Sequence, residues 1–234
     1  TKKNLGYGFH ASDGNLLIED SDDASSLFKQ NPALILTAIE LCQVHNIIPN
    51  YQIKRQIKKY CHLLDEVFFK KNKIKRFIFS TLENIHSERS LRLMHEVGVL
   101  GLLLPEYGHA HCKVSYDFYH RYTADEHSLR MVHFLEELEN TQNDLKELSD
   151  NYCQLSSKVL LKLSALLQSI GKNKNLEDPK ERLKILSLAT VHLDLNPDEV
   201  KIIDFLIGSA HLMIETALHS DTHQPAVIEN FAKQ

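Results

Sequence analysis

The scarcity and placement of glycine and proline constrain this chain more than any other feature of its sequence. Only eight glycines and six prolines occur in 234 residues, and most of them fall where amphipathic stretches begin or end. This pattern leaves little room for strands and predicts an all-α fold. Residues 5–19 are the exception, because Gly6, Gly8 and the Ser12-Asp13-Gly14 turn predict an irregular segment or a short hairpin.

Apolar periodicity and capping residues define the expected helices. Asn31-Pro32 is predicted to cap the first helix, Gly98 to end the fourth in a left-handed conformation, and Asp178 and Asn196 to open capping boxes. The expected helices cover 33–45, 52–69, 74–84, 88–97, 124–138, 155–170, a stretch from 179, 197 to about 215, and 225–231. Residues 109–122 are expected to form a long ordered loop, and the polar residues 139–151 an insertion with little fixed structure.

Composition excludes several classes of function. The chain is 43% hydrophobic and 25% charged with a net charge of −4, which disfavours non-specific binding to nucleic acid. Its four cysteines form no C-x-x-C pair, so a reducing, cytoplasmic location is expected. No apolar run reaches the length of a membrane span. Because the first residue is Thr1, we expect the chain to be a piece of a longer protein.

Fourteen histidines make metal or acid–base chemistry an obvious hypothesis. His109 and His111 could both bind a metal only if their loop were rigid and brought a further ligand close. The run Asp125-Glu126-His127 lies at a helix start, where carboxylates favour the helix dipole for purely local reasons. On spacing alone, His127 is a structural histidine. The residues by themselves therefore predict a mostly helical protein with a histidine-rich loop.

Two segments carry a family resemblance. The first is Leu91 to Gly101, LRLMHEVGVLG, followed by Leu104-Pro105-Glu106-Tyr107-Gly108. The second, Asp117 to Leu129, reads DFYHRYTADEHSL and is similar to the string D-x-x-H-x-Y-T-V-D-E-H-T-L of bacterial PII uridylyltransferase/uridylyl-removing enzymes. The chain thus resembles the central helical region and HD domain of that family. The resemblance implies an HD-domain-like helical bundle over 109–234, preceded by a smaller helical segment over 1–108.

The resemblance also implies a ligand set, because the family's HD domain binds divalent metal, which activates water to remove UMP from the PII signalling protein. His127 matches the first ligand and Asp221 the final aspartate. Gln168 and Ser169 stand where the family has a His-Asp pair, and Asp178 and Ala210 stand where it has two further histidines. His211 follows Ala210 and is rotated about 100° around the helix. We therefore expect His127 and Asp221 to be remnants of a degenerate site that holds no cofactor.

These positions lead to three hypotheses. The first is a non-hydrolytic regulatory or scaffolding domain, with a PII-like protein and other domains of the same polypeptide as partners. The second is an active phosphohydrolase that binds Mn²⁺ or Mg²⁺ through His127, Asp178, His211 and Asp221. The third is an interaction module in which residues 109–122 contact a partner. We also expect His127 to face a shallow cleft near Gln168 and Asp221. No nucleotidyltransferase motif and no ACT-type module is found in these residues.

Overall fold

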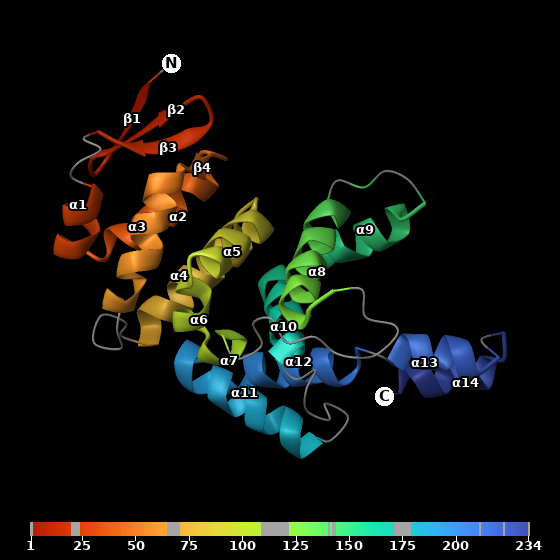
Figure 1. The fold of residues 1–234 in the computed structure, drawn as a ribbon. Helices are drawn as coiled ribbons and strands as arrows, with labels where there is room; N and C mark the ends of the chain where they lie inside the picture. Colours follow the sequence, from red (N-terminus) through yellow and green to blue (C-terminus); the bar gives the residue numbers. More distant parts are fainter. Residues whose placement is uncertain are drawn as a thin grey trace.

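Helices account for most of the chain in the computed structural model, which confirms the helical fold class (Figure 1). The structure describes residues 2–19, 24–64, 71–108, 122–139, 141, 144–170, 179–210, 212–221 and 223–233. The strands are β1 (Lys3–Gly6), β2 (Phe9–Ser12), β3 (Asn15–Ile18) and β4 (Ile48–Pro49). The helices are α1 (Ala24–Gln30), α2 (Leu34–Val44), α3 (Tyr51–Tyr60), η1 (Cys61–Leu63), α4 (Lys71–Glu83), α5 (Ser87–Glu96), α6 (Val99–Leu103), α7 (Pro105–Gly108), α8 (Ala124–Leu138), α9 (Lys146–Gln154), α10 (Lys158–Ile170), α11 (Pro179–Leu193), α12 (Pro197–Gly208), α13 (Leu212–His219) and α14 (Pro225–Ala232).

The N-terminal segment forms a small sheet where the sequence predicted at most a hairpin. The strand order is β1-β2-β3-β4, with the first two pairs antiparallel and β3 parallel to β4. Asp13 and Gly14 both have positive φ and join β2 to β3, as a two-residue hairpin turn requires. The β4 strand was not predicted, because two residues give no alternation of polar and apolar side chains.

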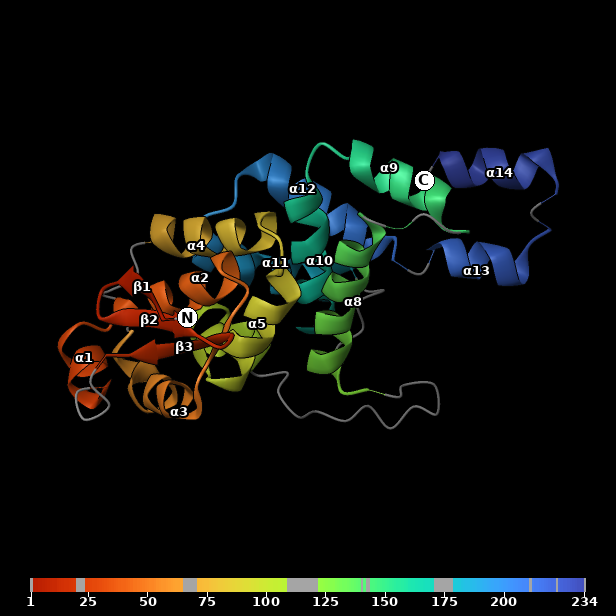
Figure 2. The same ribbon diagram turned by 90° about the horizontal axis from the view of Figure 1, so that it is seen from above.

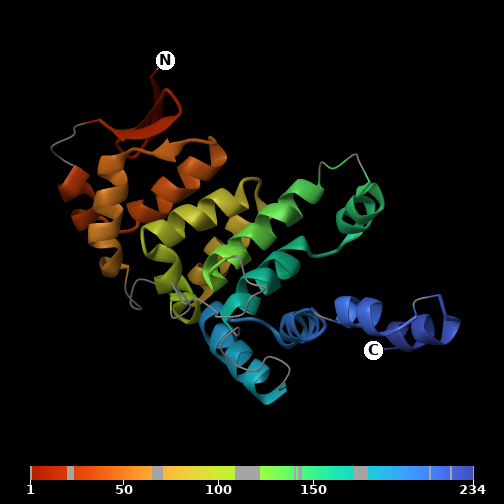
Figure 3. The same ribbon diagram turned by 45° about the vertical axis from the view of Figure 1, so that its right-hand side comes forward.

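The sheet rests on α2 and α3, and the apolar core continues from there into the helices of the second half (Figures 1 and 3). Phe9 of β2 and Leu16 of β3 are fully buried against this core. The same cluster of buried residues extends through Leu129 of α8 and Leu163 of α10 to Ile207 of α12. The division into segments 1–108 and 109–234 stays a prediction, and one continuous core crosses it.

The second half is built around α10, which packs between α8 and α12 (Figure 2). Helices α8 and α10 run antiparallel, as their ion pairs show. Glu139 at the end of α8 forms a 2.7 Å ion pair with Lys158 at the start of α10. One turn further along, Glu136 lies 3.9 Å from Lys162. Among the described helices, none is long and apolar enough to cross a membrane.

Several predicted boundaries need correction. Asn31 does not cap α2, which begins at Leu34 after Ala33, a residue in helical conformation whose side chain makes no cap. The second expected helix stops at Tyr60 and tightens into η1. Helix α12 ends at Gly208 instead of continuing to about Glu215, at a Gly-Ser pair of low helix propensity. The sequence reading also missed three short helices: α1, α6 and α7.

The predicted insertion at 139–151 is also wrong over its second half, because α9 begins at Lys146. Ser149 donates a hydrogen bond of 2.5 Å from Oγ to the carbonyl of Leu138, which holds α9 against the end of α8. Tyr152 is buried, and Lys158 lies over its ring. Other expectations are confirmed: α8 spans 124–138, Gly98 has φ +84°, and Asn196 and Glu199 form a capping box at the start of α12.

Candidate functional site

The first turn of α8 carries the Asp125-Glu126-His127 run of the family-like string. Thr123 precedes this helix in an extended conformation and makes no side-chain cap. Three consecutive polar residues on one helical turn point in different directions, about 100° apart. The side chains of Asp125 and Glu126 therefore contact different residues of α5.

Asp125 is buried at the contact between α5, α7 and α8. Its Oδ2 lies 3.0 Å from Nε2 of His95, and its Oδ1 accepts a hydrogen bond from the backbone N–H of Glu126 at 3.0 Å. The hydroxyl of Tyr107 donates to the carbonyl oxygen of Asp125 at 2.9 Å and lies 3.1 Å from Oγ of Ser128. His95 and Tyr107 meet edge to face, with ring centroids 5.5 Å apart. Asp125 therefore joins the first turn of α8 to α5 through its carboxylate and to α7 through its carbonyl oxygen.

Glu126 forms a second joint to α5. Its Oε2 accepts from Nη1 of Arg92 at 2.7 Å, and its Oε1 accepts from Nε of Arg130 at 3.0 Å. Arg92 is also bound by Glu88 at 2.6 Å. These hydrogen bonds hold the pKa of Glu126 below its ordinary value, chiefly through Arg92, and raise the pKa of Arg92. The charged carboxylate of Glu126 thus has a structural role at the junction of α5 with α8.

His127 is half-buried, and its backbone N–H donates to the carbonyl oxygen of Thr123 at 2.9 Å. The carboxylates of Asp125 and Glu126 contact side chains of α5. These two acids of the string are therefore held by other parts of the protein. His127 is the residue of the run that the resemblance assigns to metal binding.

Gln168, which stands in place of the family's ligand histidine, lies at the interface of α10 with α8. Gln168 is only 9% exposed. By the antiparallel register set by Glu139–Lys158 and Glu136–Lys162, Gln168 lies level with Leu129 and Arg130, within one turn along α8 of His127.

An apolar groove of about 220 Å³ surrounds Gln168 between α8 and α10. It is lined by Met131, Phe134, Leu135, Leu138, Leu161, Ser164, Ala165 and Gln168. A divalent cation needs several converging carboxylate or imidazole donors, and an amide among thioether and hydrocarbon groups does not supply them. The described residues that line this groove include no carboxylate and no imidazole.

Of the remaining predicted ligand positions, Ala210 and Asp221 lie within the described residues. Asp178 and His211 lie outside the described residues, as do His109, His111 and the side chain of Ser169. Ala210 occupies the turn after α12. Asp221 is exposed in the turn between α13 and α14, a helix pair that extends away from α8 and α10 (Figure 3).

The carboxylate of Asp221 has a local role in that turn. It accepts from the backbone N–H of His223 at 3.1 Å and from Nε2 of Gln224 at 3.3 Å. In the parts of the chain that the structure describes, no group of three or more His, Cys, Asp or Glu side chains is arranged to hold a metal ion. Metal binding by His127 and Asp221 stays a prediction.

A buried ionic network around Lys162 was missed by sequence reasoning. Lys162 of α10 donates to the carbonyl oxygen of Leu82 at 3.0 Å and to Oγ of Ser87 at 3.2 Å. Glu136 of α8 accepts from the backbone N–H groups of Ser87 and Glu88 at 2.6 and 3.1 Å, and so caps α5. Burial lowers the pKa of Lys162. The sequence does carry one signal of this network, because Lys162 is a lysine inside the mostly apolar run Val159–Leu167.

The architecture defines a helical domain that carries a small N-terminal sheet and a family-like string at the start of α8. Residues 9–103 match the model of the uridylyltransferase GlnD third domain. The chain is GlnD-like: it is similar to one segment of the bifunctional uridylyltransferase/uridylyl-removing enzymes.

Three such relatives illustrate the similarity. The enzyme of Nitrosococcus oceani is 29% identical over 215 residues, which cover 89% of this chain and 24% of the relative. That of Pseudomonas savastanoi pv. phaseolicola is 30% identical over 224 residues, covering 89% and 24%. That of Vibrio vulnificus is 30% identical over 183 residues, covering 77% and 20%. The chain spans about a quarter of the length of these relatives or less.

Proposed function

We propose that this chain is the HD-domain portion of a PII uridylyltransferase-like protein in which the domain has a regulatory or scaffolding role and does not hydrolyse a phosphodiester. The observation that carries the proposal is the setting of Gln168. An uncharged amide stands where the family has a ligand histidine, in a groove lined by Met131, Phe134 and Leu135.

The setting of the two acids beside His127 supports the same proposal. A metal that activates water near neutral pH needs several converging imidazole or carboxylate ligands, and the carboxylates of Asp125 and Glu126 contact His95, Arg92 and Arg130 instead. Their carboxylates maintain the junction of α5 with α8. A domain of this kind transmits or supports contacts between larger parts of a protein without chemistry of its own.

The proposed partners are other domains of the same polypeptide and a PII-like signalling protein, in the cytoplasm. The relatives are roughly four times longer than the segment that this chain matches, which supports a role within a multidomain protein. Their names describe transfer and removal of a uridylyl group, and PII is the substrate that the family resemblance implies.

The test compares the wild-type chain with Gln168→His/Ser169→Asp, which restores the family's pair. Calorimetry measures Mn²⁺ binding, and a second assay measures release of UMP from a uridylylated PII protein. We expect the wild type to bind no Mn²⁺ and to release no UMP above background. The double variant should gain Mn²⁺ binding, because an imidazole and a carboxylate are then placed within one turn of His127.

The control adds His127→Ala to the double variant, and this third substitution should remove the gained affinity. Tight Mn²⁺ binding or clear turnover by the wild type would refute the proposal. That result would favour the phosphohydrolase that uses His127, Asp178, His211 and Asp221.

A further inference from the structure

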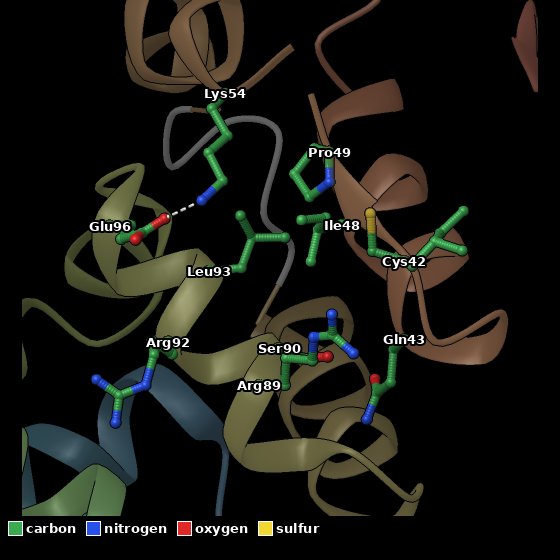
Figure 4. A pocket seen from close by; sticks show the side chains of 11 residues that line it. Cys42, Gln43, Ile48, Pro49, Lys54, Arg89, Ser90, Arg92, Leu93 and Glu96 are labelled. Atoms are coloured by element: carbon green, nitrogen blue, oxygen red, sulfur yellow. Dashed lines mark hydrogen bonds and ion pairs between the residues drawn. The ribbon is translucent and has the colours of Figure 1, made fainter. Parts of the chain in front are cut away.

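A small cavity of about 180 Å³ lies between α2, β4, α3 and α5 (Figure 4). Its apolar wall is formed by Cys42, Pro49 and Leu93, which are buried, and by Ile48 at the rim. Basic side chains from α3 and α5 stand around this wall. The cavity therefore combines a hydrocarbon surface with positive charge.

One of these cations has no anionic partner among the described residues. Arg89 donates from Nη1 to the amide oxygen of Asn46, which is neutral. By contrast, Lys54 is paired with Glu96 at 2.5 Å, and the Arg92 guanidinium is bound by Glu88 and Glu126. The formal charge that remains uncompensated at the cavity is that of Arg89.

The positive field reaches the interior of the cavity. Burial raises the pKa of the Cys42 thiol to about 12, and nearby Arg89 and Lys54 act in the opposite direction. Because burial dominates, the thiol stays protonated near neutral pH and offers neither a nucleophile nor a metal ligand. Binding of an anion is the chemistry that remains.

The walls of the cavity are held by buried and partly buried hydrogen bonds. Gln43 donates from Nε2 to the carbonyl oxygens of Thr81 at 2.9 Å and Ile85 at 3.0 Å, which ties α2 to α4. Asn50 caps α3 by accepting from the backbone N–H of Ile53 at 2.8 Å. A ligand therefore meets a preformed surface and loses little affinity to reorganisation.

We propose that this cavity binds a small aliphatic carboxylate, with the carboxylate on Arg89 and the hydrocarbon tail against Ile48, Pro49 and Leu93. The volume sets the size, since a cavity of about 150 Å³ accommodates benzene. A ligand of roughly six to eight non-hydrogen atoms fits. A single negative charge is favoured over a phosphate dianion, because Glu96 repels further charge and the apolar wall leaves phosphate oxygens without donors.

Hexanoate is the probe, and hexanamide is its uncharged analogue. Ligand-observed NMR titration of the whole chain should give a dissociation constant of roughly millimolar order for hexanoate. Hexanamide should bind about tenfold more weakly, because its neutral amide oxygen accepts a hydrogen bond from the guanidinium but forms no ion pair with it. Inorganic phosphate should not displace hexanoate at equal concentration.

The variants are Arg89→Gln and, as a matched control, Arg55→Gln on the exposed face of α3. Both arginines are exposed, and circular dichroism verifies that both variants are folded. Arg89→Gln should weaken hexanoate binding about tenfold, whereas Arg55→Gln should leave it unchanged. Equal binding of hexanoate and hexanamide, an unaffected Arg89→Gln variant, or no hexanoate signal with folded wild type would each overturn the proposal.

Discussion

Nε2 of His95 lies 3.0 Å from Oδ2 of Asp125, and this contact joins α5 to the first turn of α8. Two segments that carry the family resemblance, Leu91–Gly101 and Asp117–Leu129, therefore meet through a pair of side chains. The pair is largely withdrawn from solvent. In this chain the aspartate of the family-like string has a structural role.

Replacing Asp125 by alanine should destabilise the protein strongly. The substitution leaves His95 without this carboxylate and removes the acceptor of the Glu126 N–H, at a cost of about 2–3 kcal/mol. Urea unfolding measures the difference. Asp198→Ala is the control, because Asp198 also lies in the first turn of a helix but its side chain is 87% exposed. Its loss should cost less than ~0.5 kcal/mol. Equal effects of the two substitutions would contradict the structural role of the buried His95–Asp125 contact.

Tyr107→Phe isolates the hydroxyl that links α7 to α8. Tyr107 is fully buried, and the substitution removes its hydrogen bonds to the Asp125 carbonyl and Ser128. The expected loss is about 1–2 kcal/mol in the free energy of unfolding. Tyr51→Phe, on a residue that is 78% exposed, should change stability very little. A negligible effect at Tyr107 would show that the hydroxyl does not contribute to the junction.

The helices were largely predictable because their signals are local. The 3.6-residue periodicity located α8, and the Asn196–Glu199 capping box located the start of α12. Helix α9 was missed because Lys146–Gln154 is mostly polar. What holds it is a contact with α8 through Ser149 and Tyr152, which is tertiary and leaves little trace in its own periodicity.

The candidate site was predictable only in part, for the same reason. The family-like string located His127 and drew attention to Gln168, but the partners of Asp125 and Glu126 lie about 30 residues away on α5. The pairing of Lys162 with Glu136 joins two helices separated by a polar segment. Spacing along the chain cannot reveal which buried charges meet.

Glu126 should contribute stability that depends on acid pH. Its folded-state pKa is lowered below the ordinary value of 4.5, chiefly by Arg92. The contribution is therefore fully present above pH 4.5 and is lost as the pH falls through the lower folded pKa. We expect wild type to exceed Glu126→Gln by about 0.5–1 kcal/mol at neutral pH, because the pair is partly exposed. The difference should shrink as the pH falls below 4.5 and vanish below the folded-state pKa of Glu126. Glu137→Gln, at an exposed site beside His133, is the control. A difference independent of pH would contradict the assignment to Arg92.

Lys162 should give a pH dependence of the same sign, but at alkaline pH. Burial lowers its pKa below 10.5 in the folded state, so between the folded and unfolded pKa values the unfolded chain binds more protons. The free energy of unfolding of the wild type relative to Lys162→Met should therefore rise as the pH approaches 10.5, by at most about 1.4 kcal/mol per pH unit.

Urea unfolding at about pH 8, 9 and 10 measures this trend, and Lys158→Met is the matched control from the same helix. The hydrogen bond with Glu139 raises the pKa of Lys158, so its contribution stays constant over this range and is lost only above it. A flat difference for Lys162→Met would mean that Glu136 and the carbonyl of Leu82 fully offset the cost of burying the ammonium group.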